Sequence, residues 1–208
     1  MSDAIRVGLV GYGYASKTFH APLISGTPGL ALTTVSSSDA AKVHADWPGA
    51  KVVSAAGELL NDPEIDLVVI ATPNDTHFPL AKAALEAGKH VVVDKPFTVT
   101  LSQARELESL AKHCGRVLSV FHNRRWDSDF LTVRTLIDEG LLGEVCYFES
   151  HFDRFRPQVR QRWREQAGPG SGIWYDLGPH LLDQAVVLFG LPVSITVDLA
   201  QLRPGAQS

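Results

Sequence analysis

The sequence predicts an α/β protein built on a doubly wound parallel sheet, followed by a truncated α+β part. Between Ile5 and Phe121 short apolar runs alternate with helical patterns, and most of these runs are nearly continuous Val, Ile and Leu. After Phe121 this alternation stops. Continuous apolar runs are typical of parallel strands buried on both faces, and strand–helix alternation is typical of a doubly wound sheet. The predicted domains are therefore residues 1–121 and 122–208.

Six strands and five helices are expected in the first domain. The expected strands are Ile5–Val10, Leu30–Ser36, Val52–Ser54, Leu67–Ala71, His90–Val93 and Val117–Phe121. The expected helices are Ser16–Ile24, Ala40–Asp46, Ala56–Asn61, Thr76–Ala87 and Leu101–His113. The fourth helix has clear end signals, because Asn74, Asp75 and Thr76 supply capping oxygens and Gly88 stops it.

The second domain is expected to be incomplete. A helix at Ser128–Glu139, an alternating strand at Val145–Phe152, an Arg-rich loop, a helix near Gly172–Phe189 and a strand near Ile195–Leu199 are predicted. Two strands hardly bury both faces of a sheet, and an unpaired edge invites pairing with another chain. We therefore expect a fragment whose sheet edges are exposed.

Composition narrows the classes of partner. The chain has 208 residues, 45% of them hydrophobic, and a formal net charge of −4, which gives no reason to expect nucleic acid or an anionic membrane. Its two cysteines, Cys114 and Cys146, have no ligand-like spacing, so neither a disulfide framework nor a metal site is expected. No signal peptide or membrane-spanning run is recognisable, and the cytoplasm is the expected compartment.

The first expected strand leads into a glycine-rich turn. Its sequence is Gly11-Tyr12-Gly13-Tyr14-Ala15-Ser16, and a helix follows. The first Gly permits a tight turn, the second lets the backbone approach a pyrophosphate, and Ser16 replaces the usual third Gly or Ala. Phosphates would lie at the helix N-terminus. A purely structural turn is the alternative, but the place of this motif in the first strand–helix unit favours a Rossmann-type dinucleotide site formed by Gly11, Gly13, Tyr14, Ala15 and Ser16.

The end of the second strand bears on the choice between NADP and NAD. An NAD site usually has an acidic side chain at the position that Ser37 occupies, and Asp39 comes two residues later. A small hydroxyl can bind a 2′-phosphate that a carboxylate would repel. NADP is therefore preferred over NAD, although Ser36–Ser38 could instead be turn and capping residues.

Two clusters of polar residues follow expected strands. They are the segment from Ala71 to His77 and the tripeptide Asp94-Lys95-Pro96. Open α/β sheets bind ligands beyond the carboxyl ends of their strands, so the Lys95 ammonium could enter the cofactor crevice. The alternative is a solvated surface lysine in a turn.

A third constellation lies in the last expected helix. Asp176 precedes His180 by four residues and Asp183 follows it by three, so all three share one helical face unless Pro179 interrupts the helix. A carboxylate beside an imidazole fixes its tautomer and stabilises its protonated form. Alcohol oxidation by a nicotinamide cofactor needs such a base. An ordinary Asp–His pair on a helix is the alternative.

Together these motifs resemble the Gfo/Idh/MocA family of oxidoreductases. The markers are Gly11–Gly13, Thr72–Asn74 with His77, Ala87–Val91, Asp94–Pro96 and Asp176–Asp183. Three further segments resemble the branch that includes NADP-dependent scyllo-inositol dehydrogenases, namely Phe19–Leu23, His122–Asp127 and Trp163–Glu165. The resemblance implies an NAD(P)-dependent dehydrogenase or reductase that acts on CH–OH groups of sugars, inositols or related polyols.

The resemblance also implies roles for individual residues. Lys95 would orient the substrate hydroxyl, His180 would accept its proton, and Asp176 would orient His180. Asn123 and Arg124 are candidates for the substrate crevice. Further cofactor residues would be Thr72, Pro73, Asn74, His77 and Asp94, the last replacing the usual Glu before the lysine. Family members continue beyond this length with a sheet that commonly forms a homo-oligomer interface.

Two other functions are possible from the sequence: a cofactor-binding redox sensor on the same fold, and an inactive fragment. Retention of Lys95, Asp176 and His180 together favours the enzyme, and Lys95 and His180 are expected to converge on one crevice. The five arginines between Arg154 and Arg164 are interpreted as a solvated or interface loop, with an anionic substrate or a neighbour's cofactor phosphate as alternatives.

Overall fold

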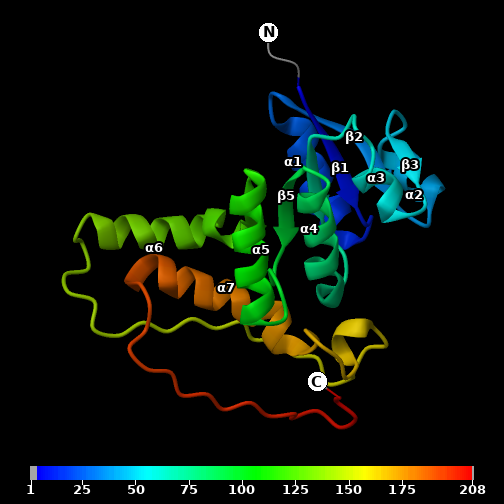
Figure 1. Ribbon diagram of the computed structural model, residues 1–208. Helices are drawn as coiled ribbons and strands as arrows, with labels where there is room; N and C mark the ends of the chain where they lie inside the picture. Colours follow the sequence, from blue (N-terminus) through cyan, green and yellow to red (C-terminus); the bar gives the residue numbers. More distant parts are fainter. Residues whose placement is uncertain (1–3, 208) are drawn as a thin grey trace. The chain divides into compact units, whose positions relative to one another are not determined.

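The structure, a computed structural model, describes residues 4–207 and divides after Phe121 into two units. The first unit holds one six-stranded sheet in the order β3-β2-β1-β4-β5-β6, with every neighbouring pair parallel (Figure 1). Its strands are β1 Ile5–Val10, β2 Leu30–Ser36, β3 Lys51–Val53, β4 Leu67–Ile70, β5 His90–Asp94 and β6 Leu118–Phe121. The predicted doubly wound parallel sheet is confirmed.

The helices of the first unit lie where the sequence predicts them, with shifted ends. They are η1 Ser16–His20, α1 Ala21–Gly26, α2 Ala40–Asp46, α3 Ala56–Leu60, η2 Asn74–Thr76, α4 His77–Glu86 and α5 Leu101–Cys114. The helix expected over Ser16–Ile24 begins instead as the π-helical turn η1, in which the Ala21 N–H bonds to the Ser16 carbonyl. Pro22 follows in the first turn of α1 and supplies no backbone N–H to the helix.

The sheet is buried on both faces because successive side chains of a strand point to opposite sides. Val68 and Ile70 of β4 join the core cluster formed with α3, α4 and α5, while Val69 joins the cluster formed with α1 and α2. Figure 1 shows α4 and α5 alongside the strands. This explains why the strands read as continuous apolar runs.

The second unit contains helices connected by coil. Its elements are η3 Asn123–Trp126, α6 Ser128–Asp138, η4 Trp163–Glu165 and α7 Gly172–Phe189. Pro179 lies inside α7 without interrupting it, so the whole face that carries Asp176, His180 and Asp183 is helical. No helix in the described part of the chain combines the length and apolar character needed to cross a bilayer.

The two strands predicted for the second unit are wrong. Val145–Phe152 and Ile195–Leu199 are coil in the structure, and Figure 1 draws no arrow in either segment. A strand needs a partner to satisfy its backbone N–H and C=O groups, and neither segment pairs with another. The apolar side chains of Ile195, Val197 and Leu199 are 69%, 57% and 68% exposed. The expected exposed sheet edge is therefore replaced by exposed apolar coil.

Candidate active site

The first glycine of the glycine-rich turn after β1 has a backbone conformation that other residues rarely adopt. Gly11 has a φ of +88°, and a Cβ there would lie 2.7 Å from the Ala71 carbonyl oxygen at the end of β4. Its N–H donates to the Ser36 carbonyl of β2 at 3.0 Å. The turn is thus held between the carboxyl ends of the two strands that flank β1.

Ser16 explains the departure from the usual fingerprint. Its side chain is fully buried, and its hydroxyl donates to the Gly11 carbonyl at 2.8 Å. A small residue still permits the close packing that a third glycine would give, while its hydroxyl satisfies a carbonyl of the turn. Ser16 therefore supports the turn from within.

A cavity of about 500 Å³ opens at the carboxyl ends of β1, β2, β3 and β4. Five of the predicted cofactor residues line it, namely Gly11, Gly13, Ser37, Thr72 and Pro73. The lining also includes Val10, Tyr12, Ser36, Ser38, Asp39, Lys42, Ser54, Ala56, Thr76 and Leu80. No atom lies within 4 Å of the position that a Cβ on Gly13 would take, so the backbone there is open to a ligand. The cavity has the size of small-molecule sites.

The other six predicted cofactor residues do not line this cavity. They are Tyr14, Ala15, Ser16, Asn74, His77 and Asp94. Tyr14 is 77% exposed, whereas His77 is fully buried. The His77 ring nitrogens lie 2.8 Å from the Pro96 carbonyl oxygen and 3.0 Å from the Thr72 carbonyl oxygen. His77 therefore joins the loop after β4 to the loop after β5.

Lys42 is a cavity residue that sequence reasoning missed. It lies in the first turn of α2, and its Nζ donates to the Tyr12 carbonyl at 3.0 Å. Its ammonium lies beside the glycine-rich turn and shares the cavity lining with Ser37 and Ser38. The sequence does contain a signal for Lys42, because this residue follows the helix cap Asp39 by three positions. The first turn of a helix that follows a strand lies near the end of that strand, where ligands bind.

Ser37 takes part in a local turn as well as in the cavity wall. Its hydroxyl accepts from the Asp39 N–H at 3.1 Å, and the Asp39 carboxylate caps α2 by accepting from the Lys42 N–H at 2.9 Å. Both interpretations of the serine segment are thus compatible with the geometry. The Asp39 carboxylate is engaged by the helix it begins.

Tyr12 anchors the glycine-rich turn to the end of α2. Its hydroxyl donates to Asp46 Oδ2 at 2.9 Å, and Lys17 pairs with the same carboxylate. Burial and the hydrogen bond to Asp46 raise the pKa of Tyr12 to about 12. The phenol therefore keeps its proton and its anchoring role throughout the neutral range.

Asp94 and Lys95 occupy the end of β5. The half-buried Lys95 donates its backbone N–H to Asp94 Oδ1 at 2.8 Å, and His20 Nε2 lies 3.8 Å from Asp94 Oδ2. Burial acts to raise the pKa of Asp94, but the contacts with His20 and with the Lys95 N–H outweigh it and hold this pKa below its usual value. The His20 ring also packs on Phe121, with 4.2 Å between ring centroids. His20 thus supports the turn that carries Lys95.

The helix α7 carries the acid–base candidates. His180 is 6% exposed, and Asp176 Oδ1 lies 3.3 Å from Arg164 Nε. Asp183 accepts two hydrogen bonds from Arg125, at 2.7 and 2.6 Å. Each of the two carboxylates therefore pairs with an arginine, Asp183 with Arg125 and Asp176 with Arg164. That Asp176 orients His180 stays a prediction.

Phe152 contacts two candidate site residues, a role that the sequence does not predict. Its ring lies 4.9 Å from the Arg124 guanidinium and 6.3 Å from the His180 ring. Arg124 Nη1 also donates to Asp127 at 2.6 Å, and Asn123 begins the same turn η3. Phe152 thus gathers the substrate candidate Arg124 and the base candidate His180, although it was expected only as a strand residue.

In the part of the chain that the structure describes, no group of three His, Cys, Asp or Glu side chains could hold a metal ion.

A parallel sheet in this order, with a glycine turn and a cavity at its carboxyl edge, defines the class of dinucleotide-binding α/β proteins. Within this class, the chain belongs to the Gfo/Idh/MocA family of oxidoreductases. Residues 5–122 match the family described as "Oxidoreductase family, NAD-binding Rossmann fold", and residues 130–208 match "GFO/IDH/MocA C-terminal domain". The family predicted from the motifs is confirmed.

The chain is similar to curated proteins and to solved structures of this family. It is 81% identical over 208 residues to the Uncharacterized oxidoreductase YdgJ of Escherichia coli (strain K12), covering 100% of this chain and 60% of that protein. It is 41% identical to scyllo-inositol 2-dehydrogenase (NADP(+)) IolW of Bacillus subtilis (strain 168), covering 99% of this chain and 58% of that protein. The solved structure of the oxidoreductase yvaA from Bacillus subtilis is 40% identical with a TM-score of 0.96, covering 100% of this chain and 59% of that chain.

Proposed function

We propose that this chain provides the cofactor site and the acid–base residues of an NADP-preferring dehydrogenase or reductase that acts on CH–OH groups of sugars, inositols or related polyols. The observation that carries the proposal is the cavity at the carboxyl edge of the sheet, lined by the glycine-rich turn, Ser37 and Lys42. The named substrate of the relative IolW supports a polyol.

The cavity fits a dinucleotide on the observations of this chain alone. No neighbouring atom covers the backbone of Gly13, so a ligand can approach it. The close contact of Gly11 with Ala71 leaves no room for a side chain in the turn. The Ser37 hydroxyl and the Lys42 ammonium line the cavity at the end of the second strand. There they would contact the ribose 2′ position, and both suit a 2′-phosphate. The Asp39 carboxylate, which also lines the cavity, accepts from the Lys42 N–H at the start of α2.

The chain's own side chains would handle the proton. A nicotinamide cofactor, when bound, exchanges a hydride with the substrate carbon. On oxidation His180 would accept the hydroxyl proton, Asp176 would keep its imidazole oriented, and Lys95 would orient the hydroxyl. Asn123 and Arg124 would contact the rest of the substrate. These roles, and the convergence of Lys95 with His180, stay predictions.

The chain spans 55–60% of the length of the first curated relatives. The exposed apolar side chains of Ile195, Val197 and Leu199 support the further proposal that this segment pairs within a sheet and that the whole protein is a homo-oligomer.

Cofactor choice is tested by equilibrium titration of the chain with NADPH and NADH. We expect NADPH to bind more tightly. Lys42→Ala should weaken NADPH about tenfold, the scale of one charged hydrogen bond, and leave NADH nearly unchanged. Ser37→Asp should weaken NADPH by charge repulsion. The matched control is Lys51→Ala. Lys51 lies at the start of β3, whereas the cavity opens at the carboxyl end of that strand, and Lys51 does not line it. Equal NADPH binding in all three variants would contradict this assignment of the 2′-phosphate site.

Turnover is tested by NADPH formation from a panel of inositols and aldoses. The assay compares this chain with a chimera that adds the remaining C-terminal residues of YdgJ. We expect NADPH formation with at least one member of the panel in the chimera. Tight cofactor binding without turnover of any member would contradict the enzyme and favour a cofactor-binding sensor.

A further inference from the structure

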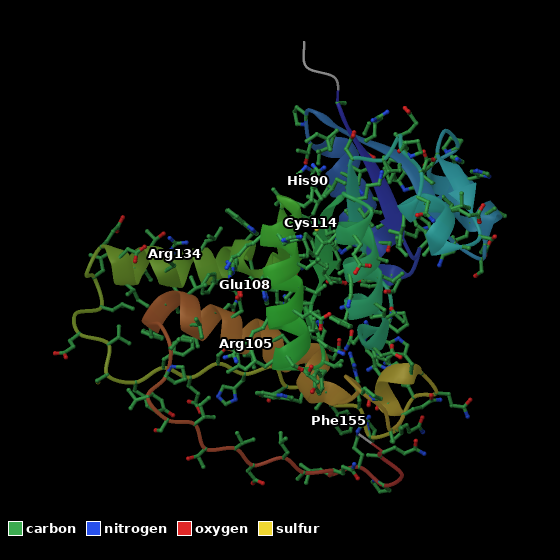
Figure 2. The ribbon with its side chains drawn as sticks, in the orientation of Figure 1. His90, Arg105, Glu108, Cys114, Arg134 and Phe155 are labelled. Atoms are coloured by element: carbon green, nitrogen blue, oxygen red, sulfur yellow. The ribbon has the colours of Figure 1, made fainter. Side chains whose placement is uncertain are left out.

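The second unit contains a small cavity between the Arg-rich segment 154–164 and the first turns of α7. Its volume is about 60 Å³. The lining consists of Arg154, Arg156, Arg162, Arg164, Glu165, Gly172, Ile173, Asp176, Leu177 and Arg203. Phe155, which Figure 2 labels, lies in the same segment and is almost fully exposed. The arginines, rather than the apolar residues of this segment, therefore form the enclosed surface.

The lining carries an excess of positive charge. Five arginines face two carboxylates, Glu165 and Asp176, which leaves a formal surplus of three positive charges (5 − 2). The buried Glu165 accepts from both Arg162 and Arg203, so two guanidiniums share one carboxylate. Burial acts to raise the pKa of Glu165, but Arg203 and Arg162 outweigh it and keep this pKa below its usual value. Glu165 is thus a fixed anion that holds two arginines at the cavity.

Two other arginines of the lining have no carboxylate partner. Within residues 4–207, neither Arg154 nor Arg156 forms an ion pair. The Arg154 guanidinium lies 5.7 Å from the ring of Phe152, the residue that also contacts His180. Guanidinium charges that outnumber the carboxylates of a recess favour the binding of an anion there.

The N-terminus of α7 adds to this preference. Gly172 and Ile173 begin the helix and line the cavity. The side chain of the N-cap residue Ser171 makes no capping hydrogen bond, and its hydroxyl donates to the Gly168 carbonyl at 2.7 Å. The first backbone N–H groups of the helix thus lack a capping side chain, and together with the helix dipole they favour an anion.

We infer that this cavity binds a carboxylate or phosphate group of the substrate, so that the substrate is a sugar acid or a sugar phosphate rather than a neutral polyol. The inference rests on the proposed function, because it takes His180 as the base. A volume of about 60 Å³ holds a group of a few heavy atoms but not a sugar ring. Asp176 lines the cavity and lies one helical turn before His180, which places the hydroxyl-bearing part of the substrate beside the base.

The experiment measures equilibrium binding of small probes to the chain by calorimetry. Glucuronate and glucose 6-phosphate are compared with their neutral counterpart glucose and with myo-inositol. We expect at least one acidic probe to bind about tenfold or more tightly than glucose, with an affinity that falls as salt is added. The comparison of glucuronate with glucose 6-phosphate tells whether the group is a carboxylate or a phosphate.

The variants Arg156→Gln and Arg154→Gln/Arg156→Gln remove charges that have no structural ion pair. Each should weaken the acidic probe, the double variant by about tenfold or more. The matched control is Arg160→Gln, because Arg160 is exposed in the same segment and does not line the cavity. Thermal unfolding midpoints show that the variants fold. Equal losses in Arg160→Gln and Arg156→Gln would overturn the site.

The remaining outcomes separate this inference from the proposed function. Acidic probes that bind no better than glucose would overturn the inference, even if neutral polyols are oxidised. Inorganic phosphate that binds where acidic sugars do not would also overturn it. Arg156-dependent binding of an acidic sugar, together with no NADPH formation from any sugar, would support the anion site and contradict the proposed function.

Discussion

Lys89 shows that a family marker can have a purely structural basis. This lysine belongs to the Ala87–Val91 motif, yet it is buried and donates to the carbonyls of Asp62 and Ile65 at 2.7 and 2.8 Å. Buried ammonium groups are tolerated only when they are hydrogen-bonded. Lys89 thus holds the loop that enters β4, the strand whose carboxyl end borders the cavity.

Arg6 and Asp66 join the starts of β1 and β4. The Asp66 carboxylate accepts from the Arg6 side chain at 3.0 and 3.1 Å and from its backbone N–H at 2.8 Å. These bonds lower the pKa of Asp66 from 3.8 to about 2. The pKa of Asp66 is lower in the folded than in the unfolded state. The ionised carboxylate therefore contributes fully to stability above about pH 4, and this contribution is lost as pH falls through about 2.

We predict that Asp66→Asn destabilises the chain at neutral pH, and that the difference from the wild type shrinks between about pH 4 and 2. Urea unfolding at a series of pH values measures this. In an Arg6→Gln background the effect of Asp66→Asn should be clearly smaller, because the side-chain partner is already absent. A difference that stays constant down to pH 2 would contradict the ion pair.

For the acid–base residues we predict that Lys95→Ala and His180→Ala each lower turnover by about 10²–10⁴-fold, the usual scale for a positioned acid–base group. The assay uses the chimera and a substrate that it oxidises. Cofactor affinity should change little, since neither residue lines the cavity. His113→Ala is the control, because His113 is exposed in the last turn of α5. Near-normal turnover in both variants would show that the chemistry lies elsewhere.

At the scale of elements, β1 and its turn contain glycines with different constraints. A Cβ on Gly8 would lie 2.6–3.0 Å from the Leu59 side chain, so this glycine lets α3 pack on the sheet. Gly13 faces open space and lines the cavity, so packing within the chain does not require a glycine there. We therefore propose that Gly8 serves packing and that Gly13 serves cofactor binding.

We predict opposite phenotypes for alanine at these two positions. Gly8→Ala should destabilise the fold by about 1–3 kcal/mol through overpacking against Leu59. Gly13→Ala should leave stability nearly unchanged and weaken NADPH about tenfold or more, because a methyl group would block the approach of the pyrophosphate. Urea unfolding and NADPH titration of both variants test this. Normal NADPH affinity in a folded Gly13→Ala variant would contradict the assigned cofactor site.

The π-helical turn η1 brings His20 to the end of β5. Its wider turn ends at His20, which is buried against Phe121 and lies 3.8 Å from Asp94. Single π turns inside helices frequently occur at functional sites. Here the turn connects the segment after the glycine-rich loop with the strand end that carries Lys95.

At the scale of the whole molecule, the two units differ in what stabilises them. The first unit has apolar clusters on both faces of its sheet. The second, in the residues described, has helices and no strand, and large apolar side chains such as Leu191, Val193 and Leu202 are mostly exposed. We therefore propose that residues 1–121 form an independent folding domain.

This proposal predicts that residues 1–121, expressed alone, unfold cooperatively and bind NADPH with nearly the affinity of the whole chain. The reason is that both core clusters and the full cavity lining belong to the first unit. Calorimetry measures both properties. In limited proteolysis of the whole chain, the coil segments 143–162 and 190–207 should be cleaved earlier in the time course than any site within residues 1–121. Non-cooperative unfolding of the isolated domain would contradict it.

The sequence by itself determined the features that depend on local chemistry. The order of strands and helices in the first unit, the glycine-rich turn before Ser16 and the family follow from apolar runs, caps and motifs within short segments. Hydrophobic burial and capping act over a few residues, so their signals are readable in one dimension. Five of the expected cofactor residues accordingly line the cavity.

Only the tertiary structure decided what depends on contacts between distant segments. Val145–Phe152 alternates like a strand, but it is coil because a strand exists only with a partner for its hydrogen bonds. His77 lies behind the cavity because the carbonyls of Thr72 and Pro96 hold it there, and Lys42 lines the cavity because α2 starts beside the glycine-rich turn. These placements arise from the packing of elements that are distant in the sequence.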